Sequence, residues 1–426
     1  MKFWKMPNKG EIVDVLLAVG IDVTTIGQMP RLLKQAGCRV SLISQKGLAV
    51  RHSRFVDRHV RWHDGTSSLV EALRRHLSLT RQAYRWIIIG DESLLWDLVD
   101  QPDKTWLEGC FPFPIDSNSV AIATSNLAFM EAAARARIPI PRFRIIGSLE
   151  EARNAASEIG YPVLVKQDRG ASGSGVRLAP TAEDLERVWQ EIGHDQFLMV
   201  QEFLEGELGE TSVLFDHGRP LCWLSTNNRR PWPNLLAASS ARQFMTHRDV
   251  EHLVIALGGL TRFNGICGID WVHDLDRDRL VILELNPRPT PGVYLEEGLR
   301  SGVSMSRGIR AWLSGKPYVQ GPPLEGNRTK EILIFPQNLF RAVDDRNLLS
   351  FLRTFAFAPW DDPLLLAAQL RRFATHYLPA SWKARARQLI QVLRLGGAPC
   401  DEIGNGQSRS PGQRTGSFSD DTKSRS

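Results

Sequence analysis

Cysteine is scarce in this chain of 426 residues, which contains only 5 of them. They are scattered: Cys38, Cys110, Cys222, Cys267 and Cys400. No two stand close enough to form a Cys-x-x-Cys pair. The odd number and the wide spacing argue against a disulfide framework and against a zinc ribbon.

Long apolar runs are also lacking. No segment has 18 consecutive uncharged apolar residues, so none predicts a membrane-spanning helix. Residues 1–20 place three lysines before an apolar stretch, but Glu11 and Asp14 interrupt it and no small-residue cleavage site follows. This segment therefore predicts a first strand rather than a signal peptide, and we expect a cytoplasmic protein.

Neither sign of charge dominates. The 53 Lys and Arg against 47 Asp and Glu leave a net charge of +6, which is small for this length and predicts no nucleic-acid partner. Apolar residues make up 42% and charged residues 23%, which is typical of a globular chain. A chain of this length predicts two or three domains.

Residues 1–120 alternate between strand and helix patterns. Strands are expected at 12–18, 40–43 and 86–89, and helices at 26–36, capped by Thr24 or Thr25, and at 68–76. This βαβ order predicts an N-terminal α/β domain with a parallel sheet. Gly20 stands almost alone after the first strand, so the glycine-rich dinucleotide fingerprint is missing and NAD is not expected.

The remaining chain is expected to form three further parts. Residues 121–316 mix helices, at 125–138 and 148–159, with strands, at 143–146 and 161–166, and so predict an α+β domain. Residues 317–400 predict a linker and a mainly helical extension. A basic amphipathic helix near Trp382 can lie on a membrane or dock on its own domain, and docking is favoured. Residues 401–426 predict a disordered tail.

A glycine-rich segment, Gly170–Gly175, is the first candidate for chemistry. Read in isolation, the segment is equally consistent with a flexible turn and with a functional loop. The segment lacks the Gly-Lys-Ser/Thr ending of a Walker A loop and the spacing of a nucleophile elbow. A strand-like stretch follows it, and Lys166 ends the strand before it. Small residues let backbone N–H groups approach phosphate, and the lysine adds a positive charge.

A second candidate is a hairpin whose strands surround residue 277. Residue numbers of opposed pairs sum to a constant, which pairs Asp270 with Glu284 at roughly 4.5–5.5 Å between Cβ atoms. Asn286 lies two residues further and so on the same face. Oxygen ligands of this kind favour Mg²⁺ or Mn²⁺ over zinc. The alternative is a solvated acidic face.

The strand at 197–204 becomes polar at Gln201 and Glu202, and such a strand end can meet a purine edge. An ordinary strand end is the alternative. A further stretch, 227–242, contains three arginines and is expected to be a loop, either at a substrate or on the surface.

Taken together, these stretches resemble the ATP-grasp superfamily over about residues 121–316. The matching segments, in chain order, are Tyr161–Lys166, Gly170–Gly175, Val200–Gly206, Gly268–Asp270 and Glu284–Pro289. The resemblance implies an ATP site between two α+β subdomains, with residues 1–120 as the preceding α/β domain.

The resemblance also implies roles for single residues. Lys166 and Arg288 are expected to act on the transferred phosphate, with Arg288 alternatively facing the substrate carboxylate. Mg²⁺ is expected on Asp270, Glu284 and Asn286. ATP is expected to contact Lys166, Gly170, Ala171, Ser172, Gly173, Ser174, Gly175, Gln201, Glu202, Phe203, Leu204 and Glu210. A phosphate-binding lysine common in the family is missing near Asn126, and Gly268 stands where D-alanine–D-alanine ligases carry an arginine.

The expected function is a ligase that joins a carboxylate to an amine through an acyl phosphate, with ATP as co-substrate and small molecules as partners. A loose similarity of residues 287–294 to tyramine–glutamate ligases suggests an amino-acid substrate. Two alternatives stay open: an ATP-binding sensor or scaffold, and an enzyme that phosphorylates a carboxylate for another acceptor. A homo-oligomer is also left open.

Overall fold

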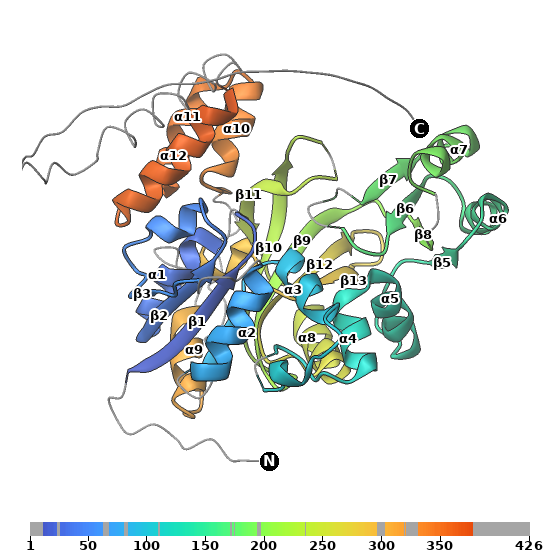
Figure 1. The fold of residues 1–426 in the computed structure, drawn as a ribbon. Helices are drawn as coiled ribbons and strands as arrows, with labels where there is room; N and C mark the ends of the chain where they lie inside the picture. Colours follow the sequence, from blue (N-terminus) through green and yellow to red (C-terminus); the bar gives the residue numbers. More distant parts are fainter. Residues whose placement is uncertain are drawn as a thin grey trace, which may run out of the picture. The chain divides into compact units, whose positions relative to one another are not determined.

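The computed structural model describes residues 12–23, 26–62, 68–80, 84–109, 111–170, 173, 175–193, 197–234, 236–295, 303–318, 320 and 331–377 (Figure 1). The chain divides into two compact units, residues 1–374 and 375–426. All three sheets belong to the first unit. The predicted combination of a parallel α/β part with α+β parts is confirmed.

The first sheet is four-stranded and parallel, in the order β3-β2-β1-β4. Its strands are β1 (Val13–Val19), β2 (Cys38–Ser44), β3 (Arg58–His59) and β4 (Trp86–Ile89). The helices of this region are α1 (Met29–Gln35), α2 (Leu69–Thr80), α3 (Glu92–Val99) and α4 (Ser117–Thr124), with 3-10 turns at Ile26–Gln28, Ala49–His52 and Thr105–Leu107. Residues 15–19 are fully buried, which explains why β1 is continuously apolar.

The helix expected at 26–36 begins as a 3-10 turn and becomes α-helical only at Met29, because Pro30 is placed best in the first turn. Its expected caps, Thr24 and Thr25, lie outside the described residues. At the carboxyl ends of β1 and β4, the Asp91 carboxylate accepts hydrogen bonds from the N–H groups of Leu94 and Gly20, at 2.9 and 2.6 Å. Asp91 thus caps α3 and holds the end of β1 beside it.

The second sheet is four-stranded and antiparallel, in the order β5-β8-β6-β7. Its strands are β5 (Phe143–Ile146), β6 (Val163–Gln167), β7 (Val176–Ala179) and β8 (Leu198–Glu202), and the adjoining helices are α5 (Asn126–Arg135), α6 (Leu149–Ile159) and α7 (Ala182–Ile192). Ser148 caps α6 as predicted, accepting from the N–H of Glu151 at 3.2 Å. Ala152, Ala156, Val163 and Val200 form part of one core between these helices and the sheet.

The third sheet has six strands in the order β13-β12-β9-β10-β11-β14, all antiparallel. The strands are β9 (Glu207–Asp216), β10 (Arg219–Pro231), β11 (Ser239–Phe244), β12 (Gly265–Asp274), β13 (Arg279–Asn286) and β14 (Glu331–Leu333). Helices α8 (Asp249–Thr261) and α9 (Met305–Leu313) and a 3-10 turn at Pro291–Tyr294 accompany it. The strands β9, β12 and β13 carry most of the chemistry described below.

After the third sheet the described chain is mainly helical, as predicted. The helices are α10 (Gln337–Asp344), α11 (Leu348–Thr354) and α12 (Pro363–Tyr377), with a 3-10 turn at Phe355–Phe357. The sequence did not reveal β14, whose three residues pair with the edge of β11. The predicted basic helix around Trp382 and the tail at 401–426 lie outside the described residues. The domain boundaries at 120, 316 and 400 stay predictions.

Candidate active site

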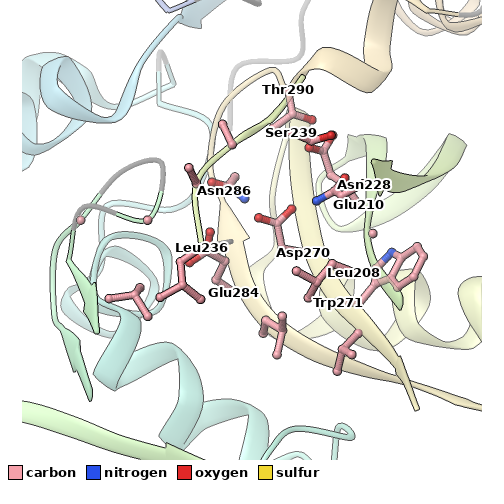
Figure 2. Close-up of a pocket in the computed structure, with 18 of the residues that line it drawn as sticks. Leu208, Glu210, Asn228, Leu236, Ser239, Asp270, Trp271, Glu284, Asn286 and Thr290 are labelled. Carbon is pink, nitrogen blue, oxygen red and sulfur yellow. The ribbon is translucent and has the colours of Figure 1, made fainter. Parts of the chain in front are cut away.

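A pocket of about 760 Å³ lies between the second and third sheets (Figure 2). Lys166 on β6 and the glycines of the β6–β7 loop line it on one side. Strands β9 to β13 line it on the other side. The positively charged side chains that line it are Lys166, Arg242 and Arg288.

Three carboxylates stand side by side in this pocket on neighbouring strands. Asp270 on β12 is opposite Glu284 on β13 and opposite Glu210 on β9. Figure 2 shows Asp270 between Glu284 and Glu210, with Asn286 close to the same group. The predicted pairing of Asp270 with Glu284, and the placement of Asn286 on the same face, are therefore confirmed.

The hairpin departs from the predicted register beyond Asp270. A bulge after this residue shifts the pairing by one, so that Trp271 is opposite Ile282. Leu283 is the additional residue on β13, and the constant sum holds only from Gly268 to Asp270. The number arithmetic assumed an uninterrupted ladder, and a bulge adds a residue to one strand only.

Burial and neighbouring negative charge raise the pKa of Asp270 well above its usual range. Burial contributes most, Glu284 and Glu210 add to it, and Arg242 opposes it. The Asp270 Oδ1 atom is buried and has no hydrogen-bond partner. A buried carboxylate without a partner is costly unless a proton or a cation neutralises it.

The residues present fit a divalent cation with oxygen ligands. Asp270 and Glu284 provide carboxylate oxygens, Asn286 is buried beside them and can provide an amide oxygen, and the unpartnered Oδ1 atom is available to a ligand. This donor set suits Mg²⁺, which prefers oxygen.

The charges of Lys166 and Arg288 are affected both by burial and by the carboxylates. Burial lowers the pKa of Lys166, and the charges of Glu284 and Asp270 act in the opposite direction. Burial likewise disfavours the charge on Arg288, but Glu92, Glu210 and Asp270 outweigh it and raise the pKa of Arg288. Both predicted phosphate-binding residues therefore lie within the electric field of the proposed metal ligands.

Arg288 is held from outside the third sheet. Its Nε atom is 3.2 Å from Oε2 of Glu92, the first residue of α3. Glu92 is itself buried, and burial together with Glu284 raises its pKa although Arg288 opposes the shift. Sequence analysis missed Glu92. The available signal was an acidic pair, Asp91-Glu92, directly after the buried strand β4, at the edge where parallel strands place functional groups.

Arg242 corrects the expectation for residues 227–242. Residues 227–231 end β10 and residues 239–242 begin β11, so only the connection between them is a loop, and Arg242 is buried on β11. Its Nη2 atom donates to Oε2 of Glu210 at 2.9 Å, and its Nη1 atom donates to Asn228. The polar residues suggested a loop, yet Asn228 and Arg242 line the pocket from the strands while Arg230 is exposed, so polarity did not distinguish strand from loop.

Glu210, expected to contact ATP, is bonded to neighbours within the protein. Besides Arg242, its Oε1 atom accepts from the Ser212 hydroxyl at 3.0 Å, and Ser212 in turn bonds Thr290 at 2.9 Å. Its position beside Asp270 places it in the carboxylate row, and its contact with ATP stays a prediction.

The predicted glycine loop joins β6 to β7. The Gly173 backbone has a φ of +77°, and a Cβ atom there would be 2.0 Å from the carbonyl oxygen of Leu236. The loop therefore packs on the segment between β10 and β11 at a point where only glycine fits. Gly170 and Gly175 also line the pocket, whereas Ala171, Ser172 and Ser174 lie outside the described residues.

The end of β8 lies in the pocket, as the purine hypothesis requires. The Gln201 side chain is fully buried, and neither of its polar atoms has a partner. The Glu202 carboxylate is occupied by Arg142, whose Nη2 atom is 3.0 Å from Oε1. Phe203 and Leu204 continue the lining. Gln201 is thus the side chain at this strand end with unused hydrogen-bonding capacity.

Asn126, where the expected lysine is missing, begins α5 and also lines the pocket. Asp168, two residues after Lys166, accepts from the Ser125 hydroxyl at 2.6 Å and from the Leu127 N–H at 3.1 Å. The first turn of α5 is therefore fastened to the end of β6. No lysine other than Lys166 lines the described pocket.

Residues 131–294 match the model of the ATP-grasp domain. These residues therefore resemble an ATP-grasp domain, as the motifs predict. Among solved structures, an N5-carboxyaminoimidazole ribonucleotide synthetase in complex with ADP aligns with a TM-score of 0.59 at 14% identity, over 78% of this chain and 85% of that one. Biotin carboxylase from Campylobacter jejuni aligns with a TM-score of 0.54 at 16% identity, over 72% of each chain.

Curated relatives match over shorter shares of their length. Urea amidolyase of Saccharomyces cerevisiae is 26% identical over 308 residues, which are 67% of this chain and 16% of that protein. A formate-dependent phosphoribosylglycinamide formyltransferase of Prochlorococcus marinus is 37% identical over 156 residues, 35% of this chain and 40% of that protein. The chain thus spans well under half the length of these relatives.

Proposed function

We propose that this protein is an ATP- and Mg²⁺-dependent ligase that joins a carboxylate to an amine through an acyl phosphate. The observation that carries the proposal is the row of Glu210, Asp270 and Glu284 on three neighbouring strands, placed in one pocket with Lys166, Arg288 and the glycine loop. A carboxylate does not lose hydroxide readily, and converting that oxygen into a phosphate makes it a good leaving group. This chemistry requires ATP but no side-chain nucleophile.

The pocket offers complementary surroundings for the two ends of ATP. Gln201 and the apolar residues Leu204 and Leu208 would surround the base, and the unsatisfied amide of Gln201 would bond it. Lys166 and the backbone of the Gly170–Gly175 loop would bind the phosphates. The close contact of Gly173 with Leu236 would help to exclude water above them.

Asp270, Glu284 and Asn286 would hold Mg²⁺. When bound there, the ion would reduce the negative charge that builds up on the transferred phosphoryl group. Arg288 would bind either the substrate carboxylate or the phosphoryl group during its transfer from ATP to that carboxylate. Glu92 would hold the Arg288 guanidinium in place. The amine would then attack the acyl carbon, and phosphate would leave.

The substrates belong to the class of small carboxylates and amines. An amino acid such as glutamate is one candidate, from the similarity of residues 287–294 to tyramine–glutamate ligases. The name of one relative specifies formate, so a one-carbon acid is a second candidate. We also propose a cytoplasmic location and leave a homo-oligomer open. No helix in the described ranges could cross a membrane.

The test measures ADP release from ATP and Mg²⁺ by the full chain against pools of carboxylates, with and without pooled amines. The proposal expects release that depends on both pools and on Mg²⁺. Release that requires only the carboxylate would indicate an enzyme that phosphorylates it for another acceptor. Binding of ATP without release under any pool would favour a sensor or scaffold, which the missing lysine near Asn126 supports.

A further inference from the structure

Two histidines and an aspartate converge at the turn of the β12–β13 hairpin. His273 lies near the end of β12, Asp278 in the turn, and His247 just before α8. The Nε2 atoms of His273 and His247 lie 3.0 and 3.3 Å from the same oxygen, Oδ1 of Asp278. The two rings are 4.7 Å apart and meet at 70°.

We propose that these three residues bind Zn²⁺ or a similar transition-metal ion. One ligand atom from each residue lies within 4.8 Å of the others. Around a tetrahedral zinc with bonds of about 2.0–2.2 Å, neighbouring ligand atoms are about 3.3–3.6 Å apart. The observed separations from Asp278 Oδ1 to the two histidines are close to this edge length, and the third separation is within 4.8 Å, so the side chains need to close by at most about 1 Å around an ion.

The burial of the three side chains suits such a site. The side chains of His247 and His273 are only 7% and 15% exposed, whereas Asp278 is 61% exposed. Packing therefore fixes the two imidazoles before any ion arrives, while the carboxylate on the turn can adjust to the metal. The exposed side leaves room for water as the fourth ligand.

The backbone next to His247 sets the tautomer of this ring in the metal-free protein. In the metal-free protein the N–H of Asp249 donates to Nδ1 at 3.1 Å, so the proton of a neutral ring is on Nε2 and faces Asp278. Binding a metal through Nε2 requires this proton to leave Nε2 and Nδ1 to become the donor, so the hydrogen bond from the Asp249 N–H breaks and the ring turns toward Oδ2 of Asp249, which lies 3.6 Å from Nδ1. A carboxylate beside the free nitrogen is the common partner of a metal-bound histidine.

Arg248 does not compete for the ligand oxygen. Its Nη2 atom is 3.3 Å from Oδ2 of Asp278, which leaves Oδ1 to the metal. The cluster is also separate from the proposed active site, because none of its three residues lines the pocket. Two imidazoles favour zinc-like ions, whereas the oxygen ligands of Asp270 and Glu284 favour Mg²⁺.

A metal here would fasten the hairpin turn to the start of α8. The same hairpin carries Asp270 and Glu284 further along its strands, and His273 is about 10 Å from Asp270 along β12. The metal would thus stabilise the element on which the active site is built without taking part in its chemistry.

The test uses Co²⁺ as a spectroscopic probe on the full chain after treatment with a chelator. Saturating Mg²⁺ is present so that it occupies the proposed site at Asp270 and Glu284. Tetrahedral Co²⁺ with nitrogen ligands absorbs strongly in the visible range, and octahedral Co²⁺ with oxygen ligands absorbs weakly. We expect one strongly absorbing Co²⁺ per chain, which Zn²⁺ displaces. His273→Gln and His247→Gln should each weaken binding at least about tenfold, since even partners of the ligands have effects of that size.

His252→Gln is the matched control, because His252 is exposed on α8 and lies outside the cluster. It should bind Co²⁺ like the unaltered protein. Asp278→Asn changes an exposed turn residue, so it should weaken binding while the far-UV circular dichroism stays unchanged. The proposal is overturned if the unaltered chain gives no visible band, or if a folded variant lacking both His247 and His273 gives the same band with the same affinity.

Discussion

Three adjacent carboxylates in one buried pocket create an excess of negative charge at the level of single residues. Arg242 is bound to Glu210 and Arg288 to a fourth carboxylate, Glu92, so Lys166 is the one remaining cation of the described pocket lining. Asp270 Oδ1 remains without a partner. The described residues therefore leave Asp270 and Glu284 incompletely neutralised, and a divalent cation would remove this cost.

Glu284→Gln should keep the fold and abolish most turnover. The amide has the same size as the carboxylate but cannot balance a divalent cation, and the ion's charge matters most during phosphoryl transfer. ADP release under saturating ATP and Mg²⁺ measures the effect, and we expect a loss of at least about 100-fold in kcat, within the range for removal of one charge-stabilising group.

Leu285→Ala, at the neighbouring position, should reduce stability rather than turnover. Leu285 is buried in the main apolar core, so its truncation should cost about 2–5 kcal/mol in the free energy of unfolding. Activity per folded molecule should be retained. An active Glu284→Gln variant with unchanged Mg²⁺ dependence would remove the metal-site assignment.

Asp270→Asn should stabilise the ligand-free protein at neutral pH. Because the folded-state pKa of Asp270 is raised, the folded state binds a proton more tightly than the unfolded state, and stability falls as pH rises through that pKa. The asparagine variant lacks this loss. Urea denaturation between pH 5 and 8 should show a smaller decline with pH in the variant, and an identical decline in both proteins would contradict the burial argument.

At the level of elements, the β6–β7 loop and the β10–β11 hairpin close over the pocket where Gly173 meets Leu236. The contact depends on the absence of a side chain at one position of the loop. The closure of the pocket is therefore a property of two elements that are far apart in the sequence.

Gly173→Val should weaken ATP binding at least about tenfold, because its Cβ atom would occupy the space of the Leu236 carbonyl and hold the loop open. Isothermal titration with ATP and Mg²⁺ measures this. Gly47→Val is the matched control, since Gly47 also has a positive φ of +82° but no atom within 4 Å of the added Cβ. Equal ATP affinity in both variants would mean that the loop is only a turn.

Across the whole molecule, the contact between Glu92 and Arg288 joins the parallel N-terminal sheet to the pocket. Glu92 begins α3, which follows β4, and Arg288 follows β13. The ion pair spans nearly 200 positions of sequence and is buried at both ends. The N-terminal region is thus part of the site rather than an appendage to it.

Glu92→Gln should cost about 3 kcal/mol in the free energy of unfolding, because it leaves the buried Arg288 without its counter-charge. Activity should also fall, since the guanidinium is no longer fixed. Glu131→Gln breaks an exposed pair with Arg135, in which Glu131 is 52% exposed, and should cost at most about 1 kcal/mol. Urea denaturation measures the loss of stability in both variants. Equal losses would show that the ion pair of Glu92 with Arg288 contributes no more than an exposed ion pair.

ATP with Mg²⁺ should stabilise the whole chain, and NAD should not. A ligand present at 100 times its Kd adds about 2.7 kcal/mol to the stability of the folded state. Thermal-shift titration with each nucleotide measures this. A shift with NAD and none with ATP would contradict both the fold assignment of the pocket and the proposed ligase.

The sequence by itself determined the elements and the local part of the site. Buried strands, the Ser148 cap and the opposition of Asp270 to Glu284 follow from periodicity and turn signals, which act over a few residues. The glycine loop after Lys166 was identified in the same way. The constant-sum rule failed only past Asp270, where a β-bulge that no local sequence pattern indicated shifts the strand pairing by one residue.

Only the tertiary structure decided which distant residues complete the site. Glu92 begins helix α3, whereas Arg242 and Glu210 lie on β11 and β9 of the third sheet, and their ion pairs depend on which segments pack together rather than on spacing along the chain. Arg242 also shows that polar residues in sequence can be buried in the fold when a charged partner is available. Local sequence patterns determine whether a segment becomes a helix or a strand. Which buried charges pair with one another depends on the packing of segments that are distant in the sequence.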